Sequence, residues 1–288
     1  MSIKNWISAA RPRTLPTSIA PVILATTYAW QEGKVDWKVF IICMLFALAA
    51  QIASNFANDY FDYKHGSDKP NRVGPRRAVA SGDIKPKTML CATITTLAIA
   101  AVLGCLLIPI GGWPLVIMGI IIILFALAYS AGPYPLSYHG LGEVTVFIFF
   151  GIIPVTATYW LQTQTVLPEV IVGAAAMGLL SSNILLVNNY RDYQTDKEDG
   201  KNTSVVILGR KFAIVAYIVN GILATSILCT SYIGASFAIL FLLLHLKTWK
   251  GLKTTEGTAL NAYIGLTARN QLLFTLIYLL VAVLQSIL

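Results

Sequence analysis

The sequence predicts an all-α, polytopic membrane protein with about nine transmembrane helices. Hydrophobic residues make up 56% of the 288-residue chain and charged residues only 12%, a balance that excludes an ordinary soluble globular protein. Apolar runs of about eighteen residues recur along the whole length, and each is long enough for a helix to cross the hydrocarbon core of a bilayer. The basic residues, which give the chain a net charge of +8, cluster between alternate runs.

Taken in order, the apolar runs predict nine spans within a single domain that covers residues 1–288. The spans lie near residues 15–31, 38–57, 88–108, 113–131, 142–161, 168–188, 211–231, 233–247 and 267–287. The seventh and eighth belong to one long apolar block, which only a short turn near Gly234 divides. The opening segment ISAARPRT is amphipathic, so we expect it to lie on the membrane surface before the first span.

The distribution of Lys and Arg predicts the orientation of the chain. With an odd number of spans, 19 of the 21 basic residues fall on the same side as the N-terminus, and only Lys34 and Lys38 fall on the other. Basic segments stay on the cytoplasmic side of a membrane, so the N-terminus and these loops are predicted to be cytoplasmic. We expect a multi-pass protein of a bacterial inner (plasma) membrane, with the lipid bilayer as a partner and no nucleic-acid partner.

Two polar islands follow apolar runs on that cytoplasmic side. The first covers 58–87 and begins NDYFDYKHGSD, and the second covers 188–203 and reads NNYRDYQTDKEDGKNT. Each contains an Asn-x₃-Asp pair at the end of an even-numbered span, Asn58 with Asp62 and Asn188 with Asp192. The recurrence after 130 residues indicates an internal repeat of four helices, near 15–131 and 142–247.

The spacing within the islands indicates a metal–diphosphate site. A step of four residues turns a helix by only about 40°, so Asn188, Asp192 and Asp196 share one narrow face. Carboxylates at the end of a membrane helix are costly unless a cation holds them. Their hard oxygen atoms suit Mg²⁺, which takes phosphate oxygens as further ligands, while Lys and Arg neutralise the remaining charge. Two such faces can clamp a diphosphate through two Mg²⁺ ions and stabilise its charge as it departs.

A diphosphate that carries a long isoprenoid would suit this setting. Membrane-embedded helices would enclose the apolar tail, and aromatic rings would stabilise the allylic cation that forms when diphosphate leaves. The other reactant must then be a nucleophile that tolerates the membrane interface, such as an electron-rich aromatic ring.

Other interpretations compete with this one. A single acidic cluster at a helix end is usually a solvated cap, but two matched clusters on one side, each followed by basic residues, favour a ligand site. A transporter would place its ionisable groups near the bilayer midplane, whereas these lie at helix ends. The aromatic segment 129–143 either covers a pocket or forms part of an interfacial belt. The basic segment 247–269 either lies against anionic lipid or reaches a ligand, and the lipid interpretation is favoured.

Five segments resemble the UbiA superfamily of intramembrane prenyltransferases. They are RPRTLPTSIAPV (11–22), NDYFDYKHGSD (58–68), RAVASGDI (77–84), YHGLGEVTVFIFFG (138–151) and NNYRDYQTDKEDGKNT (188–203) with the LG that follows. The resemblance covers nearly the whole chain. The RAVASG and NNYRD segments are most similar to the branch of the family that prenylates 1,4-dihydroxy-2-naphthoate.

The resemblance implies about nine helices around a central cavity and Mg²⁺ as the cofactor. It implies that the chain transfers a polyprenyl group from polyprenyl diphosphate to 1,4-dihydroxy-2-naphthoate. CO₂ and diphosphate would be lost, and the product would be demethylmenaquinol in menaquinone biosynthesis. The alternatives are a family member with another aromatic acceptor, such as 4-hydroxybenzoate, or a transporter that uses the acidic motifs.

Matching the motifs residue by residue implies roles in the expected site. The catalytic carboxylates implied are Asp62 and Asp192. The Mg²⁺ ligands implied are Asn58, Asp59, Asp62, Asp68, Asn188, Asp192 and Asp196. The diphosphate-binding residues implied are Lys64, Arg72, Arg77, Arg191 and Lys201. The acceptor-pocket residues implied are Tyr129, Ser130, Tyr134 and Tyr138. The chain departs from the commonest family pattern at Gly66, where an Asp is usual, and Asp68 is the nearest substitute.

Overall fold

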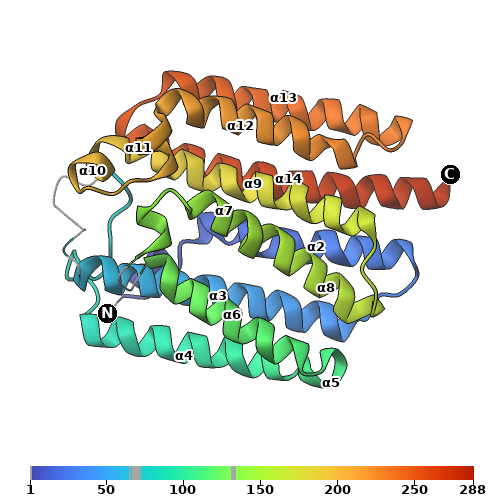
Figure 1. Ribbon diagram of the computed structural model, residues 1–288, viewed down its shortest axis with the longest axis horizontal. Helices are drawn as coiled ribbons and strands as arrows, with labels where there is room; N and C mark the ends of the chain where they lie inside the picture. The colour runs from blue at the N-terminus through green and yellow to red at the C-terminus, as the bar shows by residue number, and fades with distance from the viewer. Residues whose placement is uncertain (1, 65, 67–72, 131–133) are drawn as a thin grey trace.

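The long apolar segments fold into helices that run along one common direction (Figure 1). A computed structural model describes residues 2–64, 66, 73–130 and 134–288, and for residues 126, 127 and 130 it describes the backbone alone. Helices satisfy every backbone hydrogen bond internally, as a bilayer requires. Seven helical segments in the described chain are long and apolar enough to cross a membrane: α3 (Trp37–Lys64), α4 (Pro86–Cys105), Gly142–Thr163, α9 (Pro168–Arg191), Arg210–Ile227, α13 (Tyr232–Thr254) and Gly257–Ile287.

Three of these segments contain more than one helical element. Gly142–Thr163 consists of α7 (Gly142–Phe147), the π-helical η3 (Ile148–Ile152) and α8 (Ile153–Thr163). Arg210–Ile227 consists of α12 (Arg210–Ala224) and η4 (Thr225–Ile227). The last segment, Gly257–Ile287, consists of η5 (Gly257–Ala259) and α14 (Leu260–Ile287).

The first and fourth predicted spans also fold as helices, but they are shorter. These are α2 (Pro16–Gln31), with 16 residues, and α6 (Pro114–Ser130), with 17. Most of α2 is buried, and it packs against α3, α8 and α14, so protein rather than lipid surrounds it. The prediction that the apolar runs are helical is confirmed for their described residues, whereas nine membrane crossings and the four-helix repeat stay predictions.

Helix α9 forms the centre of the bundle. Of its apolar stretch, 72% is buried, and it packs against α2, α8, α12 and α14 (Figure 1). Its sequence is rich in Gly, Ala and Ser, residues that allow neighbouring helices to approach closely. A Cβ added to Gly173 would lie 2.5 Å from the Tyr28 hydroxyl of α2. The close packing of α9 fixes the position of its C-terminal end, where the second acidic motif lies.

The segment α7–η3 crosses α9 at two glycines. A Cβ on Gly151 would lie 2.3 Å from the Gly178 Cα, and a Cβ on Gly178 would lie 2.6 Å from the Phe147 carbonyl oxygen. Two serines of α9 strengthen this crossing: Ser181 donates to the Phe150 carbonyl at 3.2 Å, and Ser182 donates to the Glu143 carbonyl at 3.0 Å. The start of α7 is thereby held beside the C-terminal half of α9.

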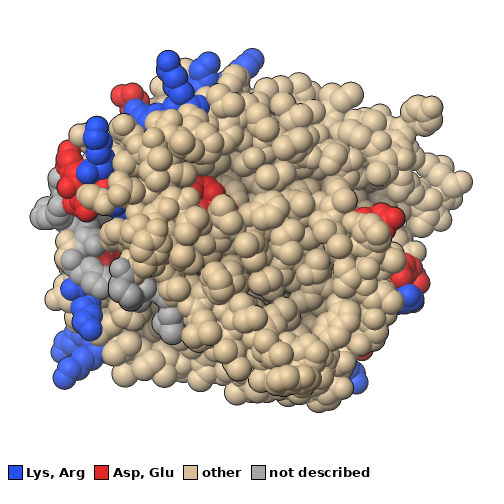
Figure 2. Space-filling model, viewed as in Figure 1, with Lys and Arg blue, Asp and Glu red and all other residues tan. Residues whose placement is uncertain are grey.

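The two ends of the bundle differ. Helices α10 (Tyr193–Glu198) and α11 (Ser204–Leu208) lie at the end where the chain starts, and the short α5 (Ile108–Gly111) lies at the other (Figure 1). Figure 2 shows most Lys and Arg side chains of this face at the end with α10 and α11, with a smaller charged group at the opposite end. Between them lies a broad band with almost no charges, as expected for a surface in contact with lipid.

Candidate active site

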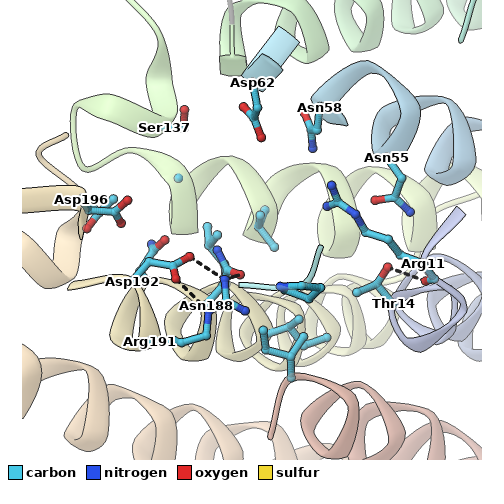
Figure 3. Close-up of a pocket in the computed structure, with 18 of the residues that line it drawn as sticks. Arg11, Thr14, Asn55, Asn58, Asp62, Ser137, Asn188, Arg191, Asp192 and Asp196 are labelled. Carbon is cyan, nitrogen blue, oxygen red and sulfur yellow. Dashed lines mark hydrogen bonds and ion pairs between the residues drawn. The ribbon is translucent and has the colours of Figure 1, made fainter. Parts of the chain in front are cut away.

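A cavity of about 360 Å³ lies at the charged end of the bundle and brings both acidic motifs together. Its wall is formed by the end of α3, the loop after it, the segment 137–143, the end of α9, and α10. The segment between α1 (Ile3–Ala10) and α2, which includes η1 (Pro12–Thr14), completes the wall. In Figure 3, Asn58 and Asp62 face Asn188 and Asp192 across this space. Two islands 130 residues apart in the sequence therefore form one site.

The first motif lies on a helix that continues beyond its apolar run. The predicted span ended at residue 57, but α3 extends to Lys64 and therefore carries the whole NDYFDYK segment. Asn58 and Asp62, one turn apart, both line the cavity. Lys64 is exposed at the end of the helix and is not among the lining residues. Asp68 and Arg72 lie outside the described residues.

Asp59 anchors the loop that follows α3. Its side chain is 2% exposed, and its two carboxylate oxygens accept hydrogen bonds from the backbone N–H groups of Ala78 and Val79, both at 3.1 Å. Ala78 and Val79 are also buried, in a cluster with Phe56 of α3. The RAVASG segment is thus fixed against α3 by both polar and apolar contacts.

This anchoring places Arg77 in the cavity. Its guanidinium pairs closely with the Asp62 carboxylate, and the Arg77 side chain is 9% exposed. The neighbouring Arg76 also lines the cavity, although it is exposed and pairs with Asp83 at 3.0 Å. Arg77, predicted to bind diphosphate, and Asp62, predicted to be catalytic, are therefore in contact.

The second motif is organised by Arg191. Its guanidinium forms a two-pronged pair with Asp192 and donates at 2.8 Å to the side-chain oxygens of Asn188 and Asn261. The Arg191 side chain is only 1% exposed, so these bonds fix its orientation. Each acidic motif thus presents an Asp that is held by an Arg, Asp62 with Arg77 and Asp192 with Arg191.

Asp196 follows one turn later and is buried. Helix α9 ends at Arg191 and α10 begins at Tyr193, yet the Asp196 N–H still donates to the Asp192 carbonyl at 2.8 Å, so the helical path continues. Lys201 Nζ lies 3.6 Å from Asp196 Oδ1. Burial raises the pKa of this carboxyl to about 6, and the charge of Lys201 opposes the rise.

The donor set fits Mg²⁺ if the ion also has phosphate ligands. No three His, Cys, Asp or Glu side chains in the described residues are close enough to hold a metal ion by themselves. However, Asp196 Oδ2 is buried and has no hydrogen-bond partner among the described residues, and two Asn and two Asp side chains face one another nearby (Figure 3). Mg²⁺ takes few protein ligands and prefers phosphate oxygens for the rest, which suits this arrangement.

The predicted acceptor-pocket residues divide into two groups. Tyr129 and Tyr138 line the cavity, together with Ser137, which the sequence did not single out. Tyr134 is exposed and stacks on His139 with 3.5 Å between the ring centroids. The side chain of Ser130 is not described. Segment 129–143 was expected either to cover a pocket or to form part of an interfacial belt. Its first residue and several residues from Ser137 onward line the cavity, which agrees with the first interpretation.

The sequence did not identify three further polar residues of the site. Arg11 projects into the cavity from a left-handed backbone position, with φ 52° (Figure 3). Asn261, at the start of α14, accepts from Arg191 and donates to the Val73 carbonyl at 3.0 Å. Glu143, at the start of α7, lines the cavity. The only signals in the sequence were the RPRT and GLGE segments, which matched the family without an assigned role.

A family model matches most of the chain. The model of the UbiA prenyltransferase family matches residues 18–263, which includes both acidic motifs and nearly all of the cavity wall. The chain belongs to the UbiA prenyltransferase family. The expected all-α polytopic fold and the enzyme class are thereby confirmed for this family member.

Several curated relatives share one name. The chain is 40% identical over 210 residues to 1,4-dihydroxy-2-naphthoate octaprenyltransferase of Escherichia coli, covering 71% of this chain and 68% of that protein. It is 39% identical over 226 residues to the protein of the same name from Mycobacterium tuberculosis, covering 78% and 76%. The similarity extends well beyond the acidic motifs.

Solved structures confirm the fold. A UbiA homolog from Archaeoglobus fulgidus, bound to DMAPP and Mg²⁺, superposes with a TM-score of 0.66 over 96% of this chain and 99% of that one, at 11% identity. The apo UbiA homolog from Aeropyrum pernix gives 0.68 over 94% and 98%, at 15% identity. The same helical architecture is therefore kept at very low sequence identity.

Proposed function

We propose that this family member is a Mg²⁺-dependent transferase that moves a polyprenyl group from its diphosphate to 1,4-dihydroxy-2-naphthoate. CO₂ and diphosphate are released, and the product is demethylmenaquinol for menaquinone synthesis. The observation that carries the proposal is the convergence of two Asn-x₃-Asp motifs, each with its own Arg, on one cavity. The names of the most similar relatives support the naphthoate as acceptor.

The polar wall of the cavity binds the diphosphate end of the donor. Asn58, Asp62, Asn188, Asp192 and Asp196 hold Mg²⁺, which stabilises negative charge on the departing diphosphate when it is bound. The ligands also proposed from the family pattern are Asp59 and Asp68, and Asp59 already accepts two backbone hydrogen bonds.

The cations complete the diphosphate site. Arg77, Arg191 and Lys201 lie beside the carboxylates. When diphosphate and metal bind together, these cations pair with the phosphate oxygens and the carboxylates pair with the metal, so every buried charge has a partner. Lys64 and Arg72 stay proposals from the family pattern.

The apolar wall receives the prenyl tail. Val146, Phe150, Ile184, Leu185 and Ile264 line the cavity alongside its polar groups. Phe150 offers an aromatic ring to the allylic cation that forms as the carbon–oxygen bond breaks. An apolar channel distinguishes chains that differ by a few methylenes only weakly, so we expect a broad range of tail lengths.

The proposed location is the bacterial inner membrane, with the N-terminus and the active-site loops in the cytoplasm. The charged end of the bundle, with α10 and α11, carries most of the visible Lys and Arg (Figure 2). The positive-inside rule assigns that end to the cytoplasm, where a soluble diphosphate product can leave.

One competition assay tests the acceptor. Purified protein in detergent receives Mg²⁺, a single polyprenyl diphosphate, and equal concentrations of 1,4-dihydroxy-2-naphthoate and 4-hydroxybenzoate, and products are identified by mass. We expect the decarboxylated, prenylated naphthalene to dominate. A product dominated by prenylated 4-hydroxybenzoate would refute the naphthoate assignment while leaving the prenyltransferase assignment intact.

The same preparation tests the metal requirement. Treatment with a chelator followed by removal of the complex should abolish turnover, and Mg²⁺ should restore it, because the cavity holds its oxygen ligands for such an ion. Full turnover of the metal-free protein would contradict the proposed role of the acidic motifs.

A further inference from the structure

Glu143 has one carboxylate oxygen satisfied and the other without a partner. Oε1 accepts hydrogen bonds from Asn189 Nδ2 at 2.8 Å and from Ser204 Oγ at 2.6 Å. Oε2 is buried, yet no donor among the described residues reaches it, and Glu143 forms no ion pair with any described Lys or Arg. A buried carboxylate oxygen without a donor is costly, so such groups in a cavity commonly serve a ligand.

The position of Glu143 is fixed from three directions. Its carbonyl accepts from Ser182 of α9, its carboxylate accepts from Asn189 of the same helix, and Ser204 of α11 adds a second donor. The close contact between Gly151 and Gly178 fixes α7 and η3 against α9. A rigid carboxylate with one oxygen that has no donor is suited to orient a reactant.

The surroundings of Glu143 differ from those of Asp62 and Asp192. Asp62 and Asp192 each have an Arg, as expected for groups that share a site with a diphosphate. Glu143 has only neutral donors, and the neighbouring residue Gly142 lies close to the Tyr129 hydroxyl, which is 3.7 Å from the Cβ position of Gly142. Glu143 therefore lies in the part of the cavity wall next to Tyr129.

The chemistry of the reactants decides what Oε2 can bind. An ionised diphosphate has no hydrogen-bond donor and repels a carboxylate, and the prenyl tail has no polar atom. The carboxylate of the acceptor is repelled for the same reason. The ring hydroxyls of the acceptor are the only donors that the two reactants contribute.

We propose that Glu143 Oε2 accepts the proton of the acceptor hydroxyl that is ortho to the attacking ring carbon. This inference rests on the proposed function. The O–H electron pair moves into the ring as the carbon that bears the carboxylate bonds to the allylic carbon. The allylic carbon–oxygen bond breaks, and diphosphate leaves with its electron pair. Loss of CO₂ returns an electron pair to the ring oxygen, which recovers the proton from Glu143.

The test substitutes Glu143→Gln and compares it with Glu169→Gln. In the Glu143→Gln variant the side-chain oxygen can keep the hydrogen bonds from Asn189 and Ser204, while the amide nitrogen replaces Oε2 and turns an acceptor into a donor. Glu169 is exposed in the first turn of α9, far along the chain from every motif, so its variant should keep wild-type activity. We expect Glu143→Gln to lower kcat about 100-fold or more.

Binding without the prenyl donor separates a direct role from a structural one. The affinities of 1,4-dihydroxy-2-naphthoate and of its 1-methyl ether are measured for both proteins. Glu143→Gln should weaken the hydroxy acid about 10-fold or more and leave the methyl ether unchanged, because only the hydroxyl donates to Oε2. Equal weakening of both ligands, or no weakening of either, overturns the proposal.

Two further readouts complete the test. The KM for polyprenyl diphosphate and the Mg²⁺ concentration for half-maximal activity should stay within about twofold of wild type, because Oε2 binds neither. A large shift in either one overturns the proposal in favour of a diphosphate or metal role. If the Glu143→Gln variant melts far below wild type, the Glu143→Asp variant is measured in its place. Its shorter side chain keeps the negative charge but moves the carboxylate away from the acceptor, so we still expect a loss of hydroxyl-specific binding.

The acceptor assignment can fail independently of Glu143. If wild-type protein prefers 4-hydroxybenzoate in the competition assay, the proposed acceptor is wrong. The same comparison is then made with 4-hydroxybenzoate and its methyl ether, and the hydroxyl-specific loss is expected unchanged. Its absence with the preferred acceptor overturns the role of Glu143.

Discussion

Neighbouring carboxylates of the first motif have different partners. Asp59 accepts two backbone N–H groups and anchors the loop, while Asp62 faces Arg77 in the cavity. The sequence placed both among the metal ligands, since Asn58, Asp59 and Asp62 all match the family motif. At the scale of single residues, two carboxylates of one motif thus have different protein partners, and Asp59 anchors the loop.

We predict that Asp59→Ala loosens the loop more than Asp59→Asn does. Alanine leaves both buried N–H groups without an acceptor and should cost about 3 kcal/mol locally, whereas asparagine keeps one oxygen and should cost about half as much. Limited trypsin digestion reports the effect as faster cleavage after Arg76 and Arg77. If cleavage is unchanged and only the Mg²⁺ requirement rises, Asp59 acts as a metal ligand instead.

The facing carboxylates should be essential for turnover. We predict that Asp62→Asn and Asp192→Asn each lower kcat about 100-fold or more, because each removes the charge that balances metal and Arg in the cavity. Helix content by circular dichroism should persist. The matched control is Asp36→Asn, at the start of α3 in the opposite end of the bundle, where asparagine caps a helix as well as aspartate does. Similar losses in all three variants would contradict a special role for the motifs.

Residue spacing predicted part of the site and not the rest. The i, i+4 pattern correctly placed Asn58 with Asp62 and Asn188 with Asp192 on cavity-facing positions, because a helix fixes short-range geometry. It did not predict that Arg77 and Arg191 pair with those Asp residues. Nor did it assign Glu143 a role, because its donors lie 46 and 61 residues away and only the tertiary fold brings them together.

At the scale of elements, hydropathy predicted the helices better than their ends. Each of the nine apolar runs is helical in its described residues, but α3 continues through polar residues to Lys64 because the loop packed against it stabilises the last turns. Helix α2 is shorter than a full span and mostly buried, which an apolar run cannot distinguish from a lipid-facing helix. Burial against α8, α9 and α14 is a property of the assembled bundle.

The crossing of α7–η3 with α9 provides a prediction at this scale. Gly178→Ala would place a Cβ 2.6 Å from the Phe147 carbonyl oxygen, so the helices must separate, at a cost of about 1 to 3 kcal/mol. Gly119→Ala on α6 meets no atom within 4 Å and should be neutral or slightly stabilising. Thermal unfolding in detergent compares the two variants. Equal melting temperatures would mean that the crossing tolerates a wider separation.

At the scale of the whole molecule, we expect the charge distribution to set the orientation in the membrane. We predict that Lys197→Cys, on α10, reacts with a membrane-impermeant maleimide only in inside-out vesicles, and that Lys34→Cys, between α2 and α3, reacts only in intact spheroplasts. Both positions are exposed, and both variants are made in a protein without its four native cysteines. Labelling of both positions from one side would contradict the topology.

Asn261 links the two polar islands through a single side chain. Its oxygen accepts from Arg191 of the second motif, and its nitrogen donates to Val73 in the loop that follows the first. Displacement of Val73 would therefore break the bond that holds the Asn261 side chain, and Asn261 is one of the groups that orient Arg191. The position of Val73 and the orientation of Arg191 are thereby linked through Asn261, so a ligand that stabilises one stabilises the other by the same free energy.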